Sequence, residues 1–371
     1  MIPAWPGQET WKLNEPLDIE VAHVFETPIP LQGPDGNETG EKTMNVIVNL
    51  VTAGGIGGWG CGAPVTEATG EKPEDTLDAA VNGLAPLLTE LAPKPVWEVL
   101  KKIEDAAPAA PAARAAFDIA IHDIWCKQLG ASMKAFLGLA RYEVETSAAV
   151  VERELSRAVD EAGARMARGF KILRVMGCGD HREDVERIKE IRRDYGRGIR
   201  IRLDARGLYT PDQAREVMKD LEGDIELFEQ PVGKDEKEEL ARLAGEFPGL
   251  VAADESAVTE GDALELFRLG VKVVKVKLMK CGGLGPALRI CDCARQAGAR
   301  VAIGCGLETA ISATAAAHVA LCRPAADLAD LDRHLLLDRL VAGGGIQVED
   351  GMVSLPDRPG LGVNVRKAYL R

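Results

Sequence analysis

After about residue 140 the chain alternates short apolar runs with longer amphipathic segments. Apolar runs of about four to eight residues predict buried strands, and a period of about 3.6 residues predicts helices. The predicted strands cover residues 144–150, 170–176, 199–205, 224–230, 250–255, 271–279, 300–305 and 326–331. The predicted helices between them include residues 183–194, 211–221, 236–243, 262–269, 286–296 and 310–321. Strand–helix units ending on an eighth strand are typical of an α/β fold, a TIM-like (β/α)7β barrel.

The first third of the chain has a different pattern. Residues 18–25 and 44–52 alternate apolar and polar side chains, which predicts two strands, and the turn-forming segment 32–37 lies between them. Residues 54–60 are too rich in glycine for a strand interior and predict a mobile loop. From residue 74 to about 130 the period is helical. We therefore predict an α+β domain over residues 1–135, completed by residues 335–371, and a barrel over residues 136–334.

Composition agrees with a globular protein of two domains. The length of 371 residues, with 46% hydrophobic and 28% charged residues, suits a barrel and a smaller domain. The net charge of −13 argues against nucleic acid or an anionic membrane as partner, because both attract basic surfaces. We see no apolar run of membrane-spanning length and no signal-peptide pattern. The eight cysteines form no C-x-x-C pair, so we expect free thiols and a cytoplasmic location.

Acidic residues stand at the ends of three consecutive predicted strands. Asp204, Glu229 and Asp254 follow apolar runs and are 25 residues apart, one strand–helix unit each. The carboxyl ends of barrel strands share one face, which is where barrel enzymes carry out their chemistry. Crowded carboxylates repel unless a cation lies among them, and oxygen ligands with room for water favour Mg²⁺. We predict one Mg²⁺ per subunit; the alternative for each acid is a helix cap or a loop salt bridge.

The segments around these acids are similar to a known family. Residues 228–231, 254–256 and 276–283 resemble motifs of the enolase superfamily, and within it the muconate-lactonizing subgroup. Gly306–Thr309 and Thr69–Glu71 fit the same pattern. The resemblance covers nearly the whole chain and is strongest to dipeptide epimerases. It implies removal of a proton from the carbon next to a carboxylate, and self-association into a homo-oligomer. It also implies that the α+β domain is a capping domain over the barrel mouth.

The resemblance also implies roles for particular side chains. Lys277, at the end of the sixth strand, would remove the α-proton, since such sites use a lysine or histidine base with Mg²⁺. Burial and Lys275 on the same face would hold this amine partly neutral. Glu308 and Arg174 would help to hold the charged intermediate, and closing loops would fall near residues 27–43 and 53–62. The alternative is that both lysines only pair with structural carboxylates.

The second strand departs from the family pattern, which is Lys-x-Lys at this place. Aligned on Gly169 and Phe170, the two lysine positions hold Arg174 and Met176. Arginine stays protonated, and methionine carries no transferable proton. Lys171 lies on the other side of the strand by alternation, so it does not replace them. A two-base racemisation therefore lacks its usual second acid, which favours a reaction at one face of the substrate.

The eighth strand bears on the substrate. Alternation puts Asp330 and Asp332 on one face, and in dipeptide epimerases of the superfamily an Asp-x-Asp here binds the substrate's α-ammonium. Arg206 is a candidate to pair with a substrate carboxylate, Cys305 a candidate proton donor, and Met176 part of the binding site. The alternatives are a pair of Asp332 with a nearby arginine, a rim salt bridge for Arg206 and an apolar role for Cys305.

These residues lead to one main hypothesis and two alternatives. We predict a small carboxylate substrate carrying an ammonium group, and an epimerase or racemase of dipeptides or amino-acid derivatives. The first alternative is a one-base lyase that removes water or ammonia from a β-substituted amino acid. The second is a relative that binds metal and ligand without turnover.

Overall fold

The computed structural model describes residues 16–32, 38–337 and 341–370. Its largest element is a sheet of eight parallel strands in the order β12-β11-β10-β9-β8-β7-β6-β5. A parallel bridge between Thr146 and Ala329 joins the two ends of this sheet and closes it into a barrel. The barrel strands are β5 (Ala148–Val150), β6 (Ile172–Met176), β7 (Arg200–Asp204), β8 (Leu227–Glu229), β9 (Leu250–Ala253), β10 (Val273–Val276), β11 (Arg300–Gly304) and β12 (Leu328–Asp330).

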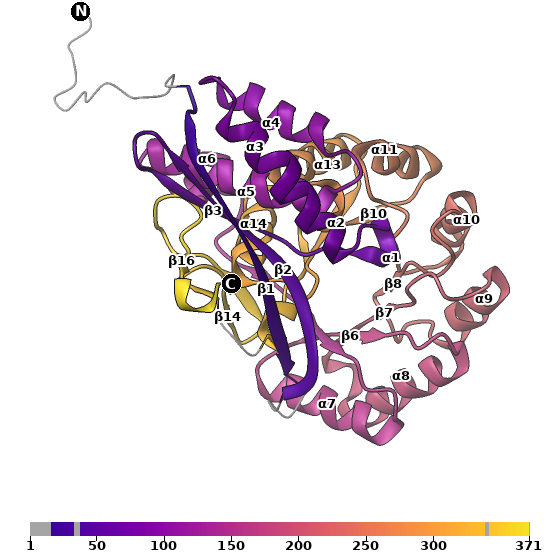
Figure 1. Cartoon of the computed structure of the whole chain (residues 1–371). Helices are drawn as coiled ribbons and strands as arrows, with labels where there is room; N and C mark the ends of the chain where they lie inside the picture. The colour runs from indigo at the N-terminus through magenta and orange to yellow at the C-terminus, as the bar shows by residue number, and fades with distance from the viewer. Residues whose placement is uncertain (1–15, 33–37, 338–340, 371) are drawn as a thin grey trace, which may run out of the picture.

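Helices follow the barrel strands along the chain and cover the outside of the barrel (Figure 1). Local signals fix where they begin: Thr210 and Thr259 each form a capping box with the third residue of the helix that follows. The predicted barrel is confirmed. The helices are α7 (Leu155–Ala167), α8 (His181–Tyr195), α9 (Pro211–Asp220), α10 (Lys237–Glu246), α11 (Glu260–Leu269), α13 (Leu284–Gln296) and α14 (Ala310–Cys322).

Two predicted barrel strands were too long. The strand predicted over residues 271–279 ends at Val276, and the short helix α12 (Leu278–Cys281) follows it. Gly282, with a φ of 97°, ends this helix in the left-handed region that glycine favours. The strand predicted over residues 144–150 is two strands, because β4 (Val144–Glu145) pairs with the C-terminal part of the chain and only β5 joins the barrel.

A second module precedes the barrel and consists of an antiparallel sheet, β1-β2-β3, and helices. The sheet is the long hairpin of β1 (Ile19–Gln32) and β2 (Glu38–Thr52), extended by β3 (Gly57–Gly62). The helical elements are α1 (Thr66–Thr69), α2 (Pro73–Asp78), the π-helix η1 (Ala79–Leu84), α3 (Ala85–Thr89), α4 (Val96–Ala106), α5 (Pro111–Gln128) and α6 (Met133–Leu137). The α+β class predicted for this region is confirmed.

The glycine-rich segment is a strand, so the loop predicted over residues 53–62 is wrong for most of its length. β3 pairs antiparallel with β2, and three of its glycines face helix α5. A Cβ atom at Gly58, Gly60 or Gly62 would lie 2.2, 1.7 or 2.5 Å from a carbonyl oxygen of that helix. The glycines therefore allow a strand and a helix to pack backbone against backbone, which is a packing requirement and not a sign of a loop.

The β1–β2 hairpin also differs from the loop predicted over residues 27–43. Residues 27–32 and 38–43 are paired strands, and residues 33–37 lie outside the described part of the chain. The hairpin nevertheless reaches the barrel: the Thr43 hydroxyl and the Asn45 side-chain amide each donate a hydrogen bond of 3.2 Å to the Leu307 carbonyl oxygen. The module thus contacts the loop after β11.

The motif at Thr69–Glu71 has a structural role in this module. The Glu71 carboxylate accepts hydrogen bonds from the Ala112 and Ala113 backbone N–H groups, at 2.7 and 3.3 Å, in the first turn of α5. A carboxylate at a helix N-terminus satisfies unpaired N–H groups and is favoured by the helix dipole. Glu71 therefore fixes the start of α5.

The C-terminal segment contacts both modules. Its elements are β13 (Ala342–Gly343), β14 (Gln347–Glu349), β15 (Met352–Ser354), β16 (Asn364–Val365) and η4 (Lys367–Tyr369). β15 pairs with β4 beside the barrel, whereas Gly360 accepts a hydrogen bond from the Met133 N–H and Leu361 donates one to Asp123 of α5. The domain limits given above stay a prediction, because this segment is shared between the modules.

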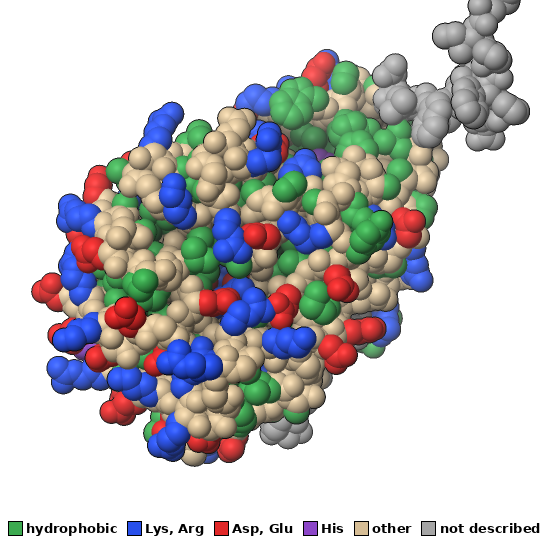
Figure 2. All heavy atoms as spheres, turned by 180° about the vertical axis from the view of Figure 1, so that it is seen from behind, with side chains coloured by type: hydrophobic (Ala, Val, Ile, Leu, Met, Phe, Trp, Pro, Cys, Tyr) green, Lys and Arg blue, Asp and Glu red, His purple; other side chains and the backbone are tan. Residues whose placement is uncertain are grey.

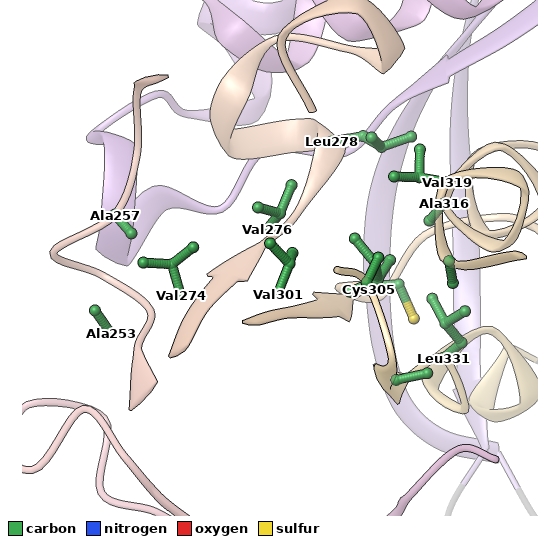
Figure 3. Close-up of a cluster of buried hydrophobic side chains, with 14 of the residues drawn as sticks. Ala253, Ala257, Val274, Val276, Leu278, Val301, Cys305, Ala316, Val319 and Leu331 are labelled. Carbon is green, nitrogen blue, oxygen red and sulfur yellow. The ribbon is translucent and has the colours of Figure 1, made fainter. Parts of the chain in front are cut away.

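The barrel strands separate an outer apolar layer from a charged interior. Outward-facing Val274 and Val276 of β10 and Val301 of β11 lie in a cluster with Ala316 and Val319 of α14 (Figure 3). The inward face begins at one end with an apolar layer of five residues. Two residues further along the chain, four of these five positions are followed by a buried charged side chain, and the fifth, on β11, by Gly304. The apolar layer consists of Leu227, Ala252, Val273, Ala302 and Leu328.

Acidic and basic side chains are interspersed on the surface. The face seen in Figure 2 carries both signs side by side, with no broad area of one sign. Among the described helices, none combines the length and the apolar character that crossing a membrane requires.

A buried histidine makes stability depend on pH. His318 of α14 is 1% exposed, and burial lowers its pKa to about 4 from an ordinary value of 6.5. The unfolded chain binds a proton at this side chain before the folded chain does, so the contribution is complete above pH 6.5 and is lost towards pH 4. The free energy of unfolding of wild type should therefore fall between pH 6.5 and pH 4. We expect it to fall by about 3 kcal/mol less in the His318→Asn variant, measured by urea unfolding. The exposed His23→Asn variant controls for the change in charge; an equal pH dependence in all three proteins would contradict the expectation.

Candidate active site

A cavity of about 630 Å³ lies at the carboxyl ends of the barrel strands and is bounded on one side by residues of the first module. Residues from both modules line it, among them Thr43 and Thr66 of the first. Six of the residues proposed from the sequence line it as well. These are Arg174, Met176, Asp204, Arg206, Lys277 and Cys305.

The three acids predicted to bind a metal come together at this end of the barrel. Asp204 and Glu229 are direct partners in the register of β7 and β8, and Asp254 follows the end of β9. Each is at most 3% exposed. The strand-end spacing in the sequence therefore brought the right three side chains to one place, where each needs a source of positive charge.

Arg174 supplies that charge to Asp204. Its Nη1 atom donates to Asp204 Oδ2 at 2.9 Å, and the second carboxylate oxygen accepts from the Arg206 backbone N–H at 3.1 Å. Arg174 is 3% exposed. Burial acts to lower its pKa, but Asp330, Glu229 and Asp204 outweigh burial and raise it. Arg174 is thus a fixed positive charge inside the barrel.

Lys275 supplies the positive charge to Glu229. Its Nζ atom lies 2.8 and 2.7 Å from the two oxygens of Glu229 and 2.8 Å from Asp330 Oδ2. All three side chains are buried. Burial raises the pKa of Glu229 and Asp204 adds to this, while Lys275 counteracts both. The ammonium group of Lys275 is therefore shared between two acids from β8 and β12.

Asp254 pairs with two lysines. Lys277 Nζ donates to one of its oxygens at 2.6 Å, and Lys280 Nζ donates to the other. Burial acts to raise the pKa of Asp254, but Lys277, Lys280 and Lys275 outweigh burial and hold it well below its ordinary value. Asp254 is therefore a carboxylate at neutral pH.

In this arrangement the three acids are paired with cationic side chains of the protein. Within the described ranges, no group of three or more His, Cys, Asp or Glu side chains is placed to hold one. Each of the six oxygens of the predicted ligands accepts a hydrogen bond from a protein group. A divalent ion would have to compete with ammonium and guanidinium groups that already neutralise the acids.

The pKa of Lys277 is raised in this structure, whereas the sequence predicted an amine held partly neutral beside a metal ion. Burial and Lys275 both act to lower its pKa, as the sequence suggested, but Asp254 and Glu229 outweigh them and raise it. The physical reason is the 2.6 Å contact with Asp254, which the sequence did not reveal. Lys277 still lines the cavity, so it is placed to meet a substrate there, and it can act as a base only after its ammonium group has lost a proton.

The two acids of the eighth strand are engaged within the protein. Asp330 contacts Lys275, Arg202 Nη1 at 2.9 Å and the Ser147 hydroxyl, and it is 1% exposed. Asp332 Oδ2 accepts from the Ala149 N–H at 2.8 Å, while its buried Oδ1 atom has no hydrogen-bond partner among the described residues. Neither acid lines the cavity, and binding of a substrate ammonium by them stays a prediction.

Comparison with known proteins now identifies the family. A model of the mandelate racemase / muconate lactonizing enzyme N-terminal domain matches residues 19–138, and a model of the enolase C-terminal domain-like family matches residues 157–369. The chain belongs to the mandelate racemase / muconate lactonizing enzyme family of the enolase superfamily. The resemblance seen in the sequence is confirmed.

Several similar members of this family are epimerases. An L-Lys-D/L-Arg epimerase of Methylococcus capsulatus is 35% identical over 87% of this chain and 92% of its own length. A hydrophobic dipeptide epimerase of Enterococcus faecalis is 34% identical over 94% of this chain and 100% of its own. The crystal structure of a dipeptide epimerase from Methylococcus capsulatus, complexed with Mg ion, has a TM-score of 0.87 and 33% identity over 94% of this chain and 100% of that one.

The departure on the second strand puts a methionine opposite the lysine. In the eight-stranded barrel, β6 and β10 are four strands apart, so the ends of these strands face each other across the mouth. Met176 ends β6, Lys277 follows β10, and both line the cavity. In this member of the family the face opposite Lys277 therefore presents a thioether, which carries no proton.

The remaining predicted residues surround the cavity in different ways. Arg206 has a φ of 58°, is exposed at the rim, and has no side-chain partner among the described residues. Burial raises the pKa of Cys305 to about 12, which leaves it protonated at neutral pH. Burial also raises the pKa of Glu308, to about 7, and one of its oxygens accepts from the Gly306 N–H at 3.0 Å. Glu308 does not line the cavity.

Sequence reasoning missed several lining residues. Arg333, Glu255 and Arg153 all line the cavity. Burial raises the pKa of Glu255 to about 7, with Asp254 adding to the effect. Arg333 directly follows Asp332, and Glu255 directly follows Asp254. The strand-end position that singled out these two acids therefore also indicated their neighbours. Arg153 lies in a loop and had no such signal.

Proposed function

We propose that this protein removes the α-proton from the carboxylate-bearing carbon of a dipeptide or related amino-acid derivative, with Lys277 as the base. The observation that carries the proposal is the position of the Lys277 amine: it lies at the end of a barrel strand and lines the cavity, at the place where the family resemblance puts a base. Removal of the α-proton places negative charge on the adjacent carboxylate. Positive side chains that face this carboxylate stabilise that charge and make the proton easier for a base in the barrel mouth to remove. Relatives named as dipeptide epimerases support the substrate class.

The charges of the cavity favour a carboxylate substrate. Its basic residues outnumber its acidic residues. The basic residues are Arg153, Arg174, Arg206, Lys277 and Arg333, and the acidic ones are Glu67, Asp204 and Glu255. No side-chain partner of Arg153 or Arg206 is found in the described part of the chain, so both guanidinium groups are free to pair with carboxylate oxygens. We infer that the substrate carboxylate binds on this basic side of the cavity.

The predicted Mg²⁺ does not enter this reaction scheme. Relatives have been solved with Mg, but in this chain the predicted ligands are engaged by Arg174, Lys275, Lys277 and Lys280. One Mg²⁺ per subunit stays a prediction of the sequence, as do self-association and a cytoplasmic location.

The residue at position 176 bears on which of two reactions follows removal of the α-proton. Epimerisation, which the similar relatives favour, needs a proton delivered at the face opposite Lys277. Elimination of a β-substituent needs only Lys277, which returns its proton to the leaving group. Met176 at the opposite face favours elimination, so a lyase is the second candidate.

Proton exchange in D₂O tests the proposal. The full-length protein is incubated with a panel of dipeptides, N-acylated amino acids and β-hydroxy amino acids, and the α-proton signal is followed by NMR. Epimerisation gives loss of the signal with both stereoisomers, and elimination gives a keto or imino product. Ligand-induced chemical-shift changes without exchange for any substrate class would contradict the proposal and favour a binding protein.

The Met176→Lys variant tests the role of the opposite face. An amine at this position supplies the proton that methionine lacks, so we expect the ratio of epimerised to eliminated or unchanged product to rise about 10-fold or more. The ratio is measured by chiral chromatography. Met176→Leu is the matched control, because it keeps an apolar side chain of similar volume. An equal ratio in both variants would show that the opposite face does not limit the reaction.

A further inference from the structure

We propose that the substrate carries a second negative group in addition to its reacting carboxylate, and that Arg333 and Arg153 bind this group. This property rests on the proposed function, and it narrows the substrate to a dipeptide or N-acyl amino acid with two carboxylates. Both arginines line the cavity, and in the described part of the chain neither guanidinium group has a hydrogen-bond or ion-pair partner. Unpaired positive charge in a binding cavity indicates an anionic ligand.

The barrel mouth has two halves, one on each side of a line from β6 to β10. Met176 ends β6 and Lys277 follows β10, so these two side chains flank the carbon that would lose its proton. The half formed by β7, β8 and β9 carries Arg206, whose unpaired guanidinium group can pair with the reacting carboxylate. The other substituents of that carbon then face the half formed by β11, β12 and β5.

In this second half the charge that meets the cavity is positive. Arg333 follows β12 and Arg153 follows β5, and these two strands are neighbours in the closed barrel. Both arginines line the cavity, whereas Asp330 and Asp332 of the same half do not. The acids that line the cavity come from β7, from the segment after β9 and from α1, and they are Asp204, Glu255 and Glu67. From the barrel, this half therefore presents guanidinium groups and no carboxylate to a substrate.

The charge of Arg333 is not balanced by its surroundings. Its Nε atom is buried and has no hydrogen-bond partner among the described residues. Burial lowers the pKa of this guanidinium group and Arg174 adds to this, and together they outweigh the attraction of Asp332. Arginine nevertheless stays protonated at neutral pH, so a buried positive charge remains without a partner. A carboxylate in the cavity would supply that partner.

The loop that carries Arg153 is held in place by a buried ion pair of α8. Arg187 Nη1 donates to the Glu152 carbonyl oxygen at 2.9 Å, and Asp184 pairs with the same guanidinium group. Arg187 and Asp184 are at most 1% exposed. Glu152 directly precedes Arg153, so the backbone under this exposed side chain has a fixed position. A group held in this way loses less freedom when a ligand binds than a group on a mobile loop.

One carboxylate does not account for all the unpaired positive charge. A carboxylate has two oxygens and pairs bidentately with a single guanidinium group, so Arg206 suffices for the reacting carboxylate and leaves Arg333 and Arg153. Val151, which lines the cavity two residues before Arg153, is 38% exposed and offers apolar contact to methylene groups. These features fit a carboxylate on a short aliphatic stem, as in a glutamyl side chain or a succinyl group.

Calorimetric titration with two matched pairs of ligands tests the proposal on the full-length protein, with millimolar Mg²⁺ in the buffer throughout. The pairs are L-Ala-L-Glu with L-Ala-L-Gln, and N-succinyl-L-leucine with N-butanoyl-L-leucine. In each pair a neutral group of similar size replaces the second carboxylate. We expect the acid of at least one pair to bind at least about 10-fold more tightly than its neutral partner, and that pair shows where the substrate carries the group. A smaller difference in both pairs, or no binding of either acid, would overturn the proposal.

Binding and turnover are measured separately, so this proposal and the proposed function can fail independently. Preferred binding of an acid by a protein that exchanges no α-proton would contradict the proposed function alone. Exchange of the α-proton without any preference for an acid would contradict the second negative group alone.

Two variants assign the preference to these arginines. Arg333→Gln and Arg153→Gln each remove one positive charge, so we expect each to lower the ratio of acid to neutral affinity at least about five-fold and to leave the neutral ligand within about two-fold of wild type. Arg182→Gln is the matched control, because Arg182 is exposed at the start of α8 and does not line the cavity. A ratio that both arginine variants leave unchanged would overturn the role assigned to these residues. If Arg333→Gln does not fold, the exposed Arg153 alone decides.

Discussion

Replacing Lys277 by methionine is expected to lower the rate of α-proton exchange at least about 10³-fold. The amine at this position lines the cavity, and no other lysine does so among the described residues. Methionine keeps the length and volume of the side chain but cannot accept a proton. The rate is measured by NMR in D₂O with whichever substrate exchanges fastest in wild type.

The fold is expected to survive this change. Asp254 keeps Lys280 as a partner when Lys277 is removed, so its charge does not become unpaired. Lys171→Met is the matched control, because Lys171 is exposed just before β6 and should leave the exchange rate within about two-fold of wild type. Exchange in the Lys277→Met variant above a tenth of the wild-type rate would exclude Lys277 as the base.

The second large effect is expected at a glycine far from the chemistry. Gly60→Ala should destabilise the protein by at least about 3 kcal/mol or prevent folding. A Cβ atom at this position would lie 1.7 Å from the Ala116 carbonyl oxygen in the middle of α5, where backbone and not a flexible side chain must move. The free energy of unfolding is measured by urea titration followed by circular dichroism.

A glycine in the same strand gives the control. A Cβ atom at Gly57 would find its nearest neighbour, Asn49 Nδ2, at 3.6 Å, which is an ordinary contact. Gly57→Ala should therefore change stability by less than about 1 kcal/mol. Similar stabilities for the two variants would show that β3 and α5 do not pack as closely as described.

The consequences of Gly60→Ala should reach the barrel. Helix α5 lies between the two modules: Asp123 accepts hydrogen bonds from the Trp59 and Leu361 N–H groups, and Asp118 accepts one from Leu284 at the start of α13. A displaced α5 would strain all three contacts. The glycine face of β3 therefore helps to hold the first module against the barrel, and with it the residues that line the cavity from that side.

Some features of the protein were determined by the sequence alone. The repeated strand and helix periods predicted the barrel, because alternation and amphipathic spacing are local properties of the chain. The strand-end rule then brought Asp204, Glu229 and Asp254 together and put Lys277 at the cavity. The departure at Met176 was also visible, because it depends only on position along a strand whose direction is known.

The tertiary structure alone decided which charges meet. Lys275 pairs with acids on β8 and β12, and Arg174 pairs with one on β7; these contacts join residues far apart in the chain. The same holds for the glycine-rich segment, which is a strand because α5 lies directly against it. Period and spacing describe one segment at a time, whereas burial, pairing and pKa depend on which segments share a volume, and only the folded barrel fixes that.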